Sequence, residues 1–170
     1  TLGRMHPRER YKGFDEVIDL LPTLSRSIPN ITYIIVGEGT DRIRLEKKCK
    51  DLGVADRVIF TGYINENEKA DYLRLADAFV MPGRGEGFGI VYLEAMACGV
   101  PVVASKLDGS KEAVKEGALG IVVDPSEPDE LESGIKTALS KPREAPKGLD
   151  DYSLENFILR VHRIIDQLNL

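Results

Sequence analysis

The sequence predicts an α/β fold built on a doubly wound, Rossmann-like parallel sheet of about six strands. Short apolar runs alternate with helix-length segments along the chain, and the hairpin dipeptide Asn-Gly is absent. Residues 31–36 form a continuous apolar and mostly β-branched run, which is typical of a strand buried on both faces. Because such sheets bind ligands at the carboxyl ends of their strands, the loops that follow strands are the first places to examine.

Each element follows from a local pattern. Strands are expected over residues 1–5, 31–36, 57–61, 78–81, 102–105 and 120–124. Helices are expected over residues 13–27, 41–52, 65–76, 109–116, 129–140 and 153–168, and another begins near Gly89. A linker rich in proline and lysine, residues 141–150, predicts a domain over residues 1–150 and a C-terminal helix within residues 151–170.

Composition excludes several classes of protein. The net charge of −5 argues against wholesale nucleic-acid binding. Cys49 and Cys98 lie far apart and suggest neither a disulfide framework nor a metal site, which favours a reducing compartment. No apolar run is long enough to span a bilayer. The chain begins without methionine, in what looks like a strand end, so we expect it to be a piece of a longer protein.

The most informative stretch is residues 83–101, where a glycine-rich loop joins a strand to a helix. Bare amides beside a helix N-terminus suit an anion such as a phosphate. Two carboxylates, Glu86 and Glu94, flank this helix start. They are unexpected in a plain phosphate site, because acids repel the ligand.

The surroundings of Glu94 point to a ligand. Its neighbours three and four positions away on the helix are apolar or small: Ile90, Val91, Ala97 and Cys98. A carboxylate on such a face is costly to bury without hydrogen bonds, and the hydroxyls of a ribose would supply them. The alternative is a helix register that leaves Glu94 in solvent.

Glu86 and Phe88 belong to the glycine-rich loop itself. Glycines on both sides leave Glu86 accessible, so it can accept hydrogen bonds from sugar hydroxyls or stabilise a developing cation. The alternative is an ordinary loop acid. Phe88 would either cover a ligand or close the top of the sheet.

Two further loops carry candidate binding residues. Arg4 and Lys12 follow the first strand and suit a diphosphate, with surface cations as the alternative. Tyr63 and Ile64 follow the strand at residues 57–61, and would flank a nucleotide base or pack on the sheet edge. Lys69 would either reach the base or remain solvated.

Taken in order, these motifs resemble one known family. The matching segments are Gly3-Arg4, Lys12-Gly13, residues 36–39, residues 58–62 and residues 86–105. The last contains two glutamates separated by seven residues. Over nearly its whole length the chain resembles the C-terminal, donor-binding half of a retaining GT-B glycosyltransferase of family 4, the group 1 glycosyl transferases.

The resemblance implies a role for each candidate residue. The diphosphate would be bound by Arg4, Lys12 and the amides of Ile90 and Val91, the ribose by Glu94, the sugar by Glu86, Phe88 and Gly89, and the base around Tyr63, Ile64 and Lys69. Glu86 would also be catalytic. The implied reaction transfers a hexosyl group from a UDP- or GDP-linked sugar with retention, with no metal or other cofactor.

The resemblance also implies partners outside this chain. A sugar or lipid-linked acceptor would bind through an N-terminal domain, toward which the helix in residues 151–170 would pack. The protein would be cytoplasmic, either free or peripheral to the inner face of the membrane.

Two alternatives remain open at the level of sequence. They are a nucleotide-sugar epimerase of the same architecture and a non-catalytic nucleotide-binding module. Moreover, residues 6–10 lengthen the loop between Arg4 and Lys12, so the reach of Lys12 is an open question.

Overall fold

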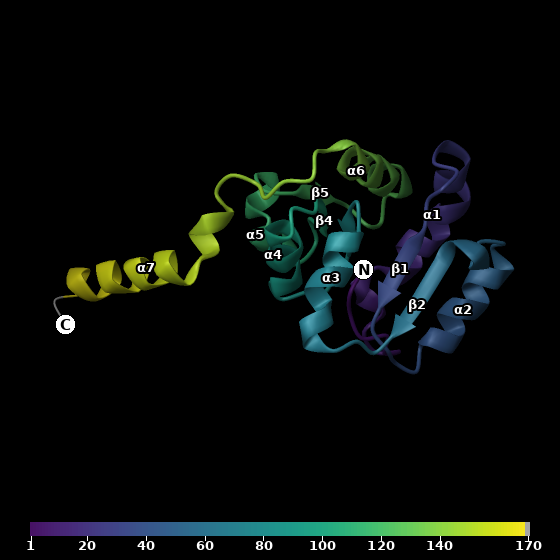
Figure 1. Cartoon of the computed structure of the whole chain (residues 1–170), viewed down its shortest axis with the longest axis horizontal. Coiled ribbons are helices and arrows are strands. Elements are labelled where there is room, and N and C mark those ends of the chain that lie inside the picture. Colours follow the sequence, from purple (N-terminus) through teal and green to yellow (C-terminus); the bar gives the residue numbers. More distant parts are fainter. Residues whose placement is uncertain (169–170) are drawn as a thin grey trace.

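The structure is a computed structural model that describes residues 1–168 (Figure 1). Its strands are β1 (Tyr33–Val36), β2 (Val58–Gly62), β3 (Phe79–Val80), β4 (Val102–Ser105) and β5 (Ile121–Val123). Its helices are α1 (Phe14–Ser27), α2 (Arg42–Asp51), α3 (Lys69–Leu75), α4 (Ile90–Ala97), α5 (Ser110–Ala113), α6 (Pro128–Ser140) and α7 (Leu154–Gln167). Five 3-10 turns complete the described residues: η1 (Arg10–Lys12), η2 (Ala55–Arg57), η3 (Glu66–Glu68), η4 (Lys115–Gly117) and η5 (Leu149–Tyr152).

All the ladders between strands are parallel, as the sequence predicts. β1 pairs with β2, and β3, β4 and β5 form a second group in that order. The first residues lie between the two groups: Leu2 bridges to Val36 in parallel, and the Thr1 hydroxyl donates to the carbonyl of Val80. The resulting order places the first segment between β1 and β3, which is the arrangement of a doubly wound Rossmann sheet.

The expected first strand, residues 1–5, is shorter than predicted. Only Leu2 forms a bridge, and a bend at Gly3 turns the chain out of strand geometry. The sheet therefore consists of five strands and one bridged segment instead of six full strands.

Helices cover both faces of the sheet, and each face has its own core. Along β4, Val103 packs in the cluster that α1, α2 and α6 share, whereas Val102 and Ala104 pack in the cluster of α3, α4 and α5. This alternation follows from the two-residue period of a strand. Both clusters exclude water, which is why all four residues of β4 are buried.

The helix predicted over residues 109–116 and the predicted linker differ from expectation. The helix expected over residues 109–116 ends as α5 at Ala113, because Lys115 and Glu116 take left-handed backbone angles, with φ of 48° and 52°. The predicted linker at residues 141–150 leads into η5, which packs against α4.

The helix α7 projects away from the body of the domain (Figure 1). It exposes a row of large apolar side chains: Leu154, Phe157, Ile158, Leu159, Ile164 and Ile165. The predicted C-terminal helix therefore exists, although the last two residues of the predicted segment 151–170 lie outside the described residues. None of the helices within residues 1–168 is long and apolar enough to cross a membrane.

Candidate functional site

Three loops at the carboxyl ends of the strands meet at one place. We call residues 3–12 the first loop, residues 82–89 the glycine-rich loop and residues 106–109 the third loop. The amide of Arg84 donates to the carbonyl of Tyr11 at 2.7 Å. At Gly13, with φ of 82°, a Cβ atom would lie only 2.7 Å from the carbonyl oxygen of Pro82. The lack of a side chain at Gly13 therefore lets the first two loops touch.

The contact between these loops brings Lys12 to Glu86. The Lys12 ammonium lies 3.4 Å from the Glu86 carboxylate, and the two side chains are 16% and 24% exposed. The long insertion after Arg4 thus does not carry Lys12 away from the glycine-rich loop. The structure therefore places a cation and an acid of the predicted site in direct contact.

Glu94 also has a lysine partner. The Lys69 ammonium lies 2.7 Å from the Glu94 carboxylate and also contacts Glu66. Hydrogen bonds with Glu66, and then with Glu94, raise the pKa of Lys69. The partner that Glu94 needs comes from α3, a helix distant in sequence. We call Lys12–Glu86 and Lys69–Glu94 the cleft pairs.

The start of α4 lies between the two acids. Gly89 takes a left-handed conformation at the N-cap, and the first recorded backbone bond runs from the amide of Tyr92 to the Gly89 carbonyl at 3.0 Å. The amides of Ile90 and Val91 come before this bond, in the part of a helix where amides have no acceptor within the helix itself. Tyr92 is fully buried and its hydroxyl donates to the Met81 carbonyl, so α4 is fixed on the end of β3.

Arg4 occupies a different environment from Lys12. Its side chain is 69% exposed and pairs with Glu9 within the first loop. The hydrogen bond with Glu9 raises the pKa of Arg4 and lowers that of Glu9. Sequence analysis grouped Arg4 with Lys12, but the structure brings only Lys12 into contact with Glu86.

The remaining predicted residues are Phe88, Tyr63 and Ile64. The Phe88 ring packs edge-on against Tyr152 of η5 at a centroid distance of 5.9 Å. Tyr63 is 71% exposed, and Ile64 is half-buried beside it. The roles assigned to these side chains toward a base or a sugar stay predictions.

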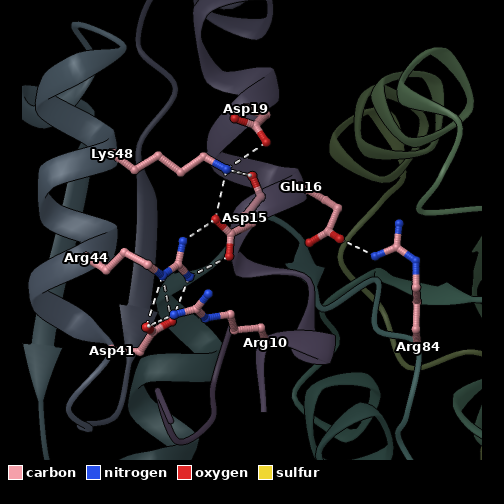
Figure 2. A network of polar contacts seen from close by, with 8 residues as sticks. All are labelled: Arg10, Asp15, Glu16, Asp19, Asp41, Arg44, Lys48 and Arg84. Carbon is pink, nitrogen blue, oxygen red and sulfur yellow. Dashed lines mark hydrogen bonds and ion pairs between the residues drawn. The ribbon is translucent and has the colours of Figure 1, made fainter. Parts of the chain in front are cut away.

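Behind the first loop, an ion-pair network links α1 to α2 (Figure 2). Its members, which we call the α1–α2 network, are Arg10, Asp15, Asp19, Asp41, Arg44 and Lys48. Arg44 binds both oxygens of Asp15, at 2.7 and 2.6 Å, and also binds Asp41. Burial acts to raise the pKa of Asp15, but hydrogen bonds from Arg44 and Lys48 outweigh it and hold the pKa at about 2.

The first turn of α1 also holds the glycine-rich loop. Glu16, next to Asp15, points to the other side of the helix and pairs with Arg84 (Figure 2). Arg10 ties the first loop to Asp41 at the start of α2. Both loops of the site are thus anchored to the same part of the protein.

Sequence analysis missed Asp108 in the third loop. Its carboxylate accepts hydrogen bonds from the amides of Gly85 and Glu86, at 3.1 and 3.0 Å. It also accepts from the amide and hydroxyl of Ser110, at 3.0 and 2.6 Å. The only sequence signal was its place, in a loop after a strand and directly before a helix start.

The arrangement combines two kinds of chemistry. Lys12 and the first amides of α4 suit an anion, whereas Glu86 and Glu94 suit hydroxyl groups. Within residues 1–168, no three histidine, cysteine, aspartate or glutamate side chains are grouped so that they would hold a metal ion. A ligand that carries phosphate and hydroxyl groups together would match this set.

Comparison with known proteins agrees with this chemistry. The family model described as glycosyl transferases group 1 matches residues 2–155. The chain belongs to the glycosyl transferases group 1 family. Its fold is that of the GT-B glycosyltransferases that it matches.

One curated relative of the group 1 chain is a mannosyltransferase. The GDP-mannose-dependent alpha-(1-6)-phosphatidylinositol monomannoside mannosyltransferase of Mycolicibacterium smegmatis is 43% identical over 151 residues. That alignment covers 85% of this chain and 39% of the relative. The chain therefore spans well under half the length of this curated relative.

Two solved structures share the group 1 fold. Anabaena HepE in complex with UDP is 25% identical, with a TM-score of 0.77, covering 98% of this chain and 48% of that one. The C-terminal domain of LpcC from Francisella tularensis, a group 1 protein, is 29% identical, with a TM-score of 0.68, covering 82% and 75%. The second comparison matches this chain to a domain that was itself solved separately.

Proposed function

We propose that the full-length protein containing this chain transfers a hexosyl group from a nucleotide-diphosphate sugar to an acceptor, with retention of configuration. The observation that carries the proposal is the contact of Lys12 with Glu86 beside Gly89, the residue that caps the start of α4. Family membership and a relative named as a mannosyltransferase support it. This chain would form the donor-binding half of the enzyme, with residues 1–150 as the nucleotide-sugar domain.

In this proposal the donor displaces the lysines from the cleft pairs. Lys12 moves from Glu86 to the diphosphate, where the amides of Ile90 and Val91 also donate. Arg4 joins them once it leaves Glu9, a rearrangement that its exposed position allows. Charge-assisted contacts of this kind are the strongest hydrogen bonds in proteins.

The acids then receive hydroxyl groups. Glu94 binds the ribose, while Glu86, Phe88 and Gly89 bind the transferred sugar. Glu86 also stabilises the positive charge that develops on the sugar as its bond to the diphosphate breaks. The cations stabilise the departing diphosphate, and the acceptor hydroxyl bonds to the anomeric carbon on the face that the diphosphate leaves, giving its proton to the departing phosphate oxygen.

The base would lie beyond the ribose. Tyr63 and Ile64 would flank it, and Lys69, freed from Glu94, would reach toward it. GDP-mannose is the first donor to test, because the mycolicibacterial relative is named for it. A UDP-linked sugar is the second, because the Anabaena structure holds UDP.

An N-terminal domain would complete the enzyme. The chain spans 39% of the mycolicibacterial relative, which leaves room in such a protein for a second domain. The exposed apolar face of α7 would pack against that domain, which would bind a sugar or lipid-linked acceptor. The full-length protein would act in the cytoplasm, free or at the inner face of the membrane, and without a metal cofactor.

The product of the reaction tests the proposal. The full-length protein would be incubated with GDP-mannose or UDP-glucose and candidate acceptors, and the product linkage would be determined by NMR. We expect release of the nucleoside diphosphate and an α-linked product from an α-linked donor. An inverted linkage would reject retention, and isomerisation of the donor without an acceptor would favour an epimerase. A full-length protein that binds these donors but remains inactive with every acceptor would favour a binding module.

A further inference from the structure

The third loop holds the backbone on both sides of Glu86. We propose that Asp108 is a positioning residue that fixes the conformation of Glu86, an inference that rests on the proposed role of Glu86 in transfer. The Asp108 carboxylate accepts a hydrogen bond from the amide of Glu86 at 3.0 Å, and the amide of Gly109 donates to the Glu86 carbonyl at 2.8 Å. Both polar groups of the Glu86 backbone are therefore engaged by the third loop.

The side chains of Asp108 and Glu86 differ in how many hydrogen bonds they accept from the protein. Asp108 accepts four hydrogen bonds, from Gly85, Glu86 and twice from Ser110, which matches the four lone-pair sites of a carboxylate. Among residues 1–168, the Glu86 side chain has one hydrogen-bond partner, Lys12 at 3.4 Å. Asp108 is saturated by the protein, whereas Glu86 keeps its capacity to bind a ligand.

The contacts that hold Asp108 in place extend into the core. The Ser110 hydroxyl, which donates to Asp108, lies 3.1 Å from the amide and 3.3 Å from the carbonyl of Ser105. Ser105 and Ser110 are fully buried, and Ser105 ends the central strand β4. A chain of contacts thus connects a rigid strand to the backbone of Glu86, which is how sites gain precision.

Close backbone approach reinforces the same geometry. At Gly109, a Cβ atom would lie 1.9 Å from the carbonyl oxygen of Gly87. Only glycine permits the third loop to lie this near to the glycine-rich loop. The contact leaves Asp108 directly against the amides that it binds.

Asp108 also decides where a ligand anion can bind. The amides of Gly85 and Glu86 would otherwise form part of an anion site in the glycine-rich loop. A protein carboxylate already occupies them, so the amides of Ile90 and Val91 remain for a phosphate. The glycine-rich loop would therefore present the Glu86 side chain, and not its amides, to the sugar.

The test compares Asp108→Ala with Asp108→Asn in the full-length protein. We expect Asp108→Ala to lower kcat for GDP-mannose or UDP-glucose turnover by about 10- to 100-fold, with donor KM changed less than about threefold, because misplacement of a reacting group acts on kcat. Asp108→Asn keeps one acceptor oxygen and should retain more activity. Added formate, which can occupy the vacated anion position, should partly restore kcat of Asp108→Ala.

Amide hydrogen exchange gives a readout independent of turnover. The amides of Gly85 and Glu86 should exchange faster in Asp108→Ala than in wild type. Asp51→Ala is the control, since Asp51 is a carboxylate on the surface of α2 that pairs with Lys47 of the same helix. That control should leave kcat within about twofold, as expected for a substitution outside the site.

The outcomes separate the two proposals. Unchanged kcat and unchanged exchange at residues 85 and 86 in a folded Asp108→Ala protein would overturn the positioning role. If that variant does not fold, Ser110→Ala should still speed exchange at these amides, and its failure to do so would overturn the role as well. A wild-type protein without any transfer activity would instead reject the proposed function, while the exchange measurement would still show whether Asp108 holds the loop.

Discussion

The α1–α2 network and the cleft pairs are both built from ion pairs, yet they differ in how completely their members are satisfied. In the network, Arg44 binds Asp15 through two hydrogen bonds and also binds Asp41, and Lys48 adds a further contact to Asp15. In the cleft pairs, Glu86 has one ion-pair partner among the described residues, Lys12 at 3.4 Å. The network is saturated, whereas the Lys12–Glu86 pair is open to exchange.

This difference separates the charges that hold the fold from the charges that would bind a ligand. A bidentate arginine with several partners keeps its geometry, because replacing one contact leaves the others in place. A single ion pair that is partly exposed contributes little stability and costs little to open. The network would therefore persist when a donor binds, whereas the lysines of the cleft pairs would change partners.

The largest effect should come from Glu86→Gln, which keeps the shape of the side chain but removes its charge. We expect kcat to fall about 1,000-fold in the full-length protein, because the charge stabilises the transition state. Glu46→Gln is the matched control, since Glu46 pairs with Arg42 on the surface of α2. Steady-state kinetics would measure kcat of both variants. Equal losses of kcat would contradict the distinction between Glu86 and a surface acid such as Glu46.

Lys12→Ala should have the next largest effect. Loss of one charge-assisted contact to the diphosphate is expected to weaken donor binding about 10- to 100-fold. Lys69→Ala should weaken binding less, because Lys69 is assigned to the neutral base. Calorimetry on both variants would measure this difference, and a larger loss for Lys69 would reverse the assignment of the two cleft pairs.

The network should control stability at acid pH. The pKa of Asp15 is lowered from 3.8 to about 2, so its contribution is complete above pH 4 and disappears as the pH falls toward 2. This shift corresponds to about 2 kcal/mol of the free energy of unfolding. Urea unfolding of the chain and of Asp15→Asn, at pH values from 2 to 7, would measure it. A variant that unfolds with the same pH dependence as wild type would show that Asp15 does not supply this contribution.

The smallest effect should distinguish the two acids from each other. Glu94→Gln should weaken binding of GDP or UDP about 10-fold, because a ribose contact is lost. Glu86→Gln should not weaken the affinity for the nucleotide alone, since the sugar is absent and Lys12 no longer has to leave an acid to reach the diphosphate. Equal losses for both variants with the bare nucleotide would contradict the separation of ribose and sugar sites.

Local sequence patterns predicted the parts of the site that depend on local structure. The loop at Glu86 and the start of α4 at Ile90 follow from glycines placed between an apolar strand and a helical run. All four residues of the cleft pairs were predicted to belong to the site, but their pairing with one another was not. Lys69 and Glu94 are 25 residues apart and meet only when α3 packs beside α4.

Contacts between distant loops limited the rest of the prediction. Asp108 binds amides 22 and 23 residues away, which no periodicity reveals. The early end of α5 depends on left-handed angles at Lys115 and Glu116, two residue types that usually stay in the right-handed region. The first strand was overestimated because an apolar residue, Leu2, forms only a bridge before the bend at Gly3.

Calorimetric titration of the full-length protein with GDP-mannose and UDP-glucose tests the central claim most directly. The claim is that Lys12 exchanges Glu86 for a donor diphosphate. We predict that at least one donor binds with a Kd below about 1 mM, and that Lys12→Ala weakens this binding about 10-fold or more. Lys47→Ala, which removes a surface ion pair with Asp51, should leave binding unchanged. Binding that is absent at millimolar concentration, or that is equal in wild type and Lys12→Ala, would contradict the account.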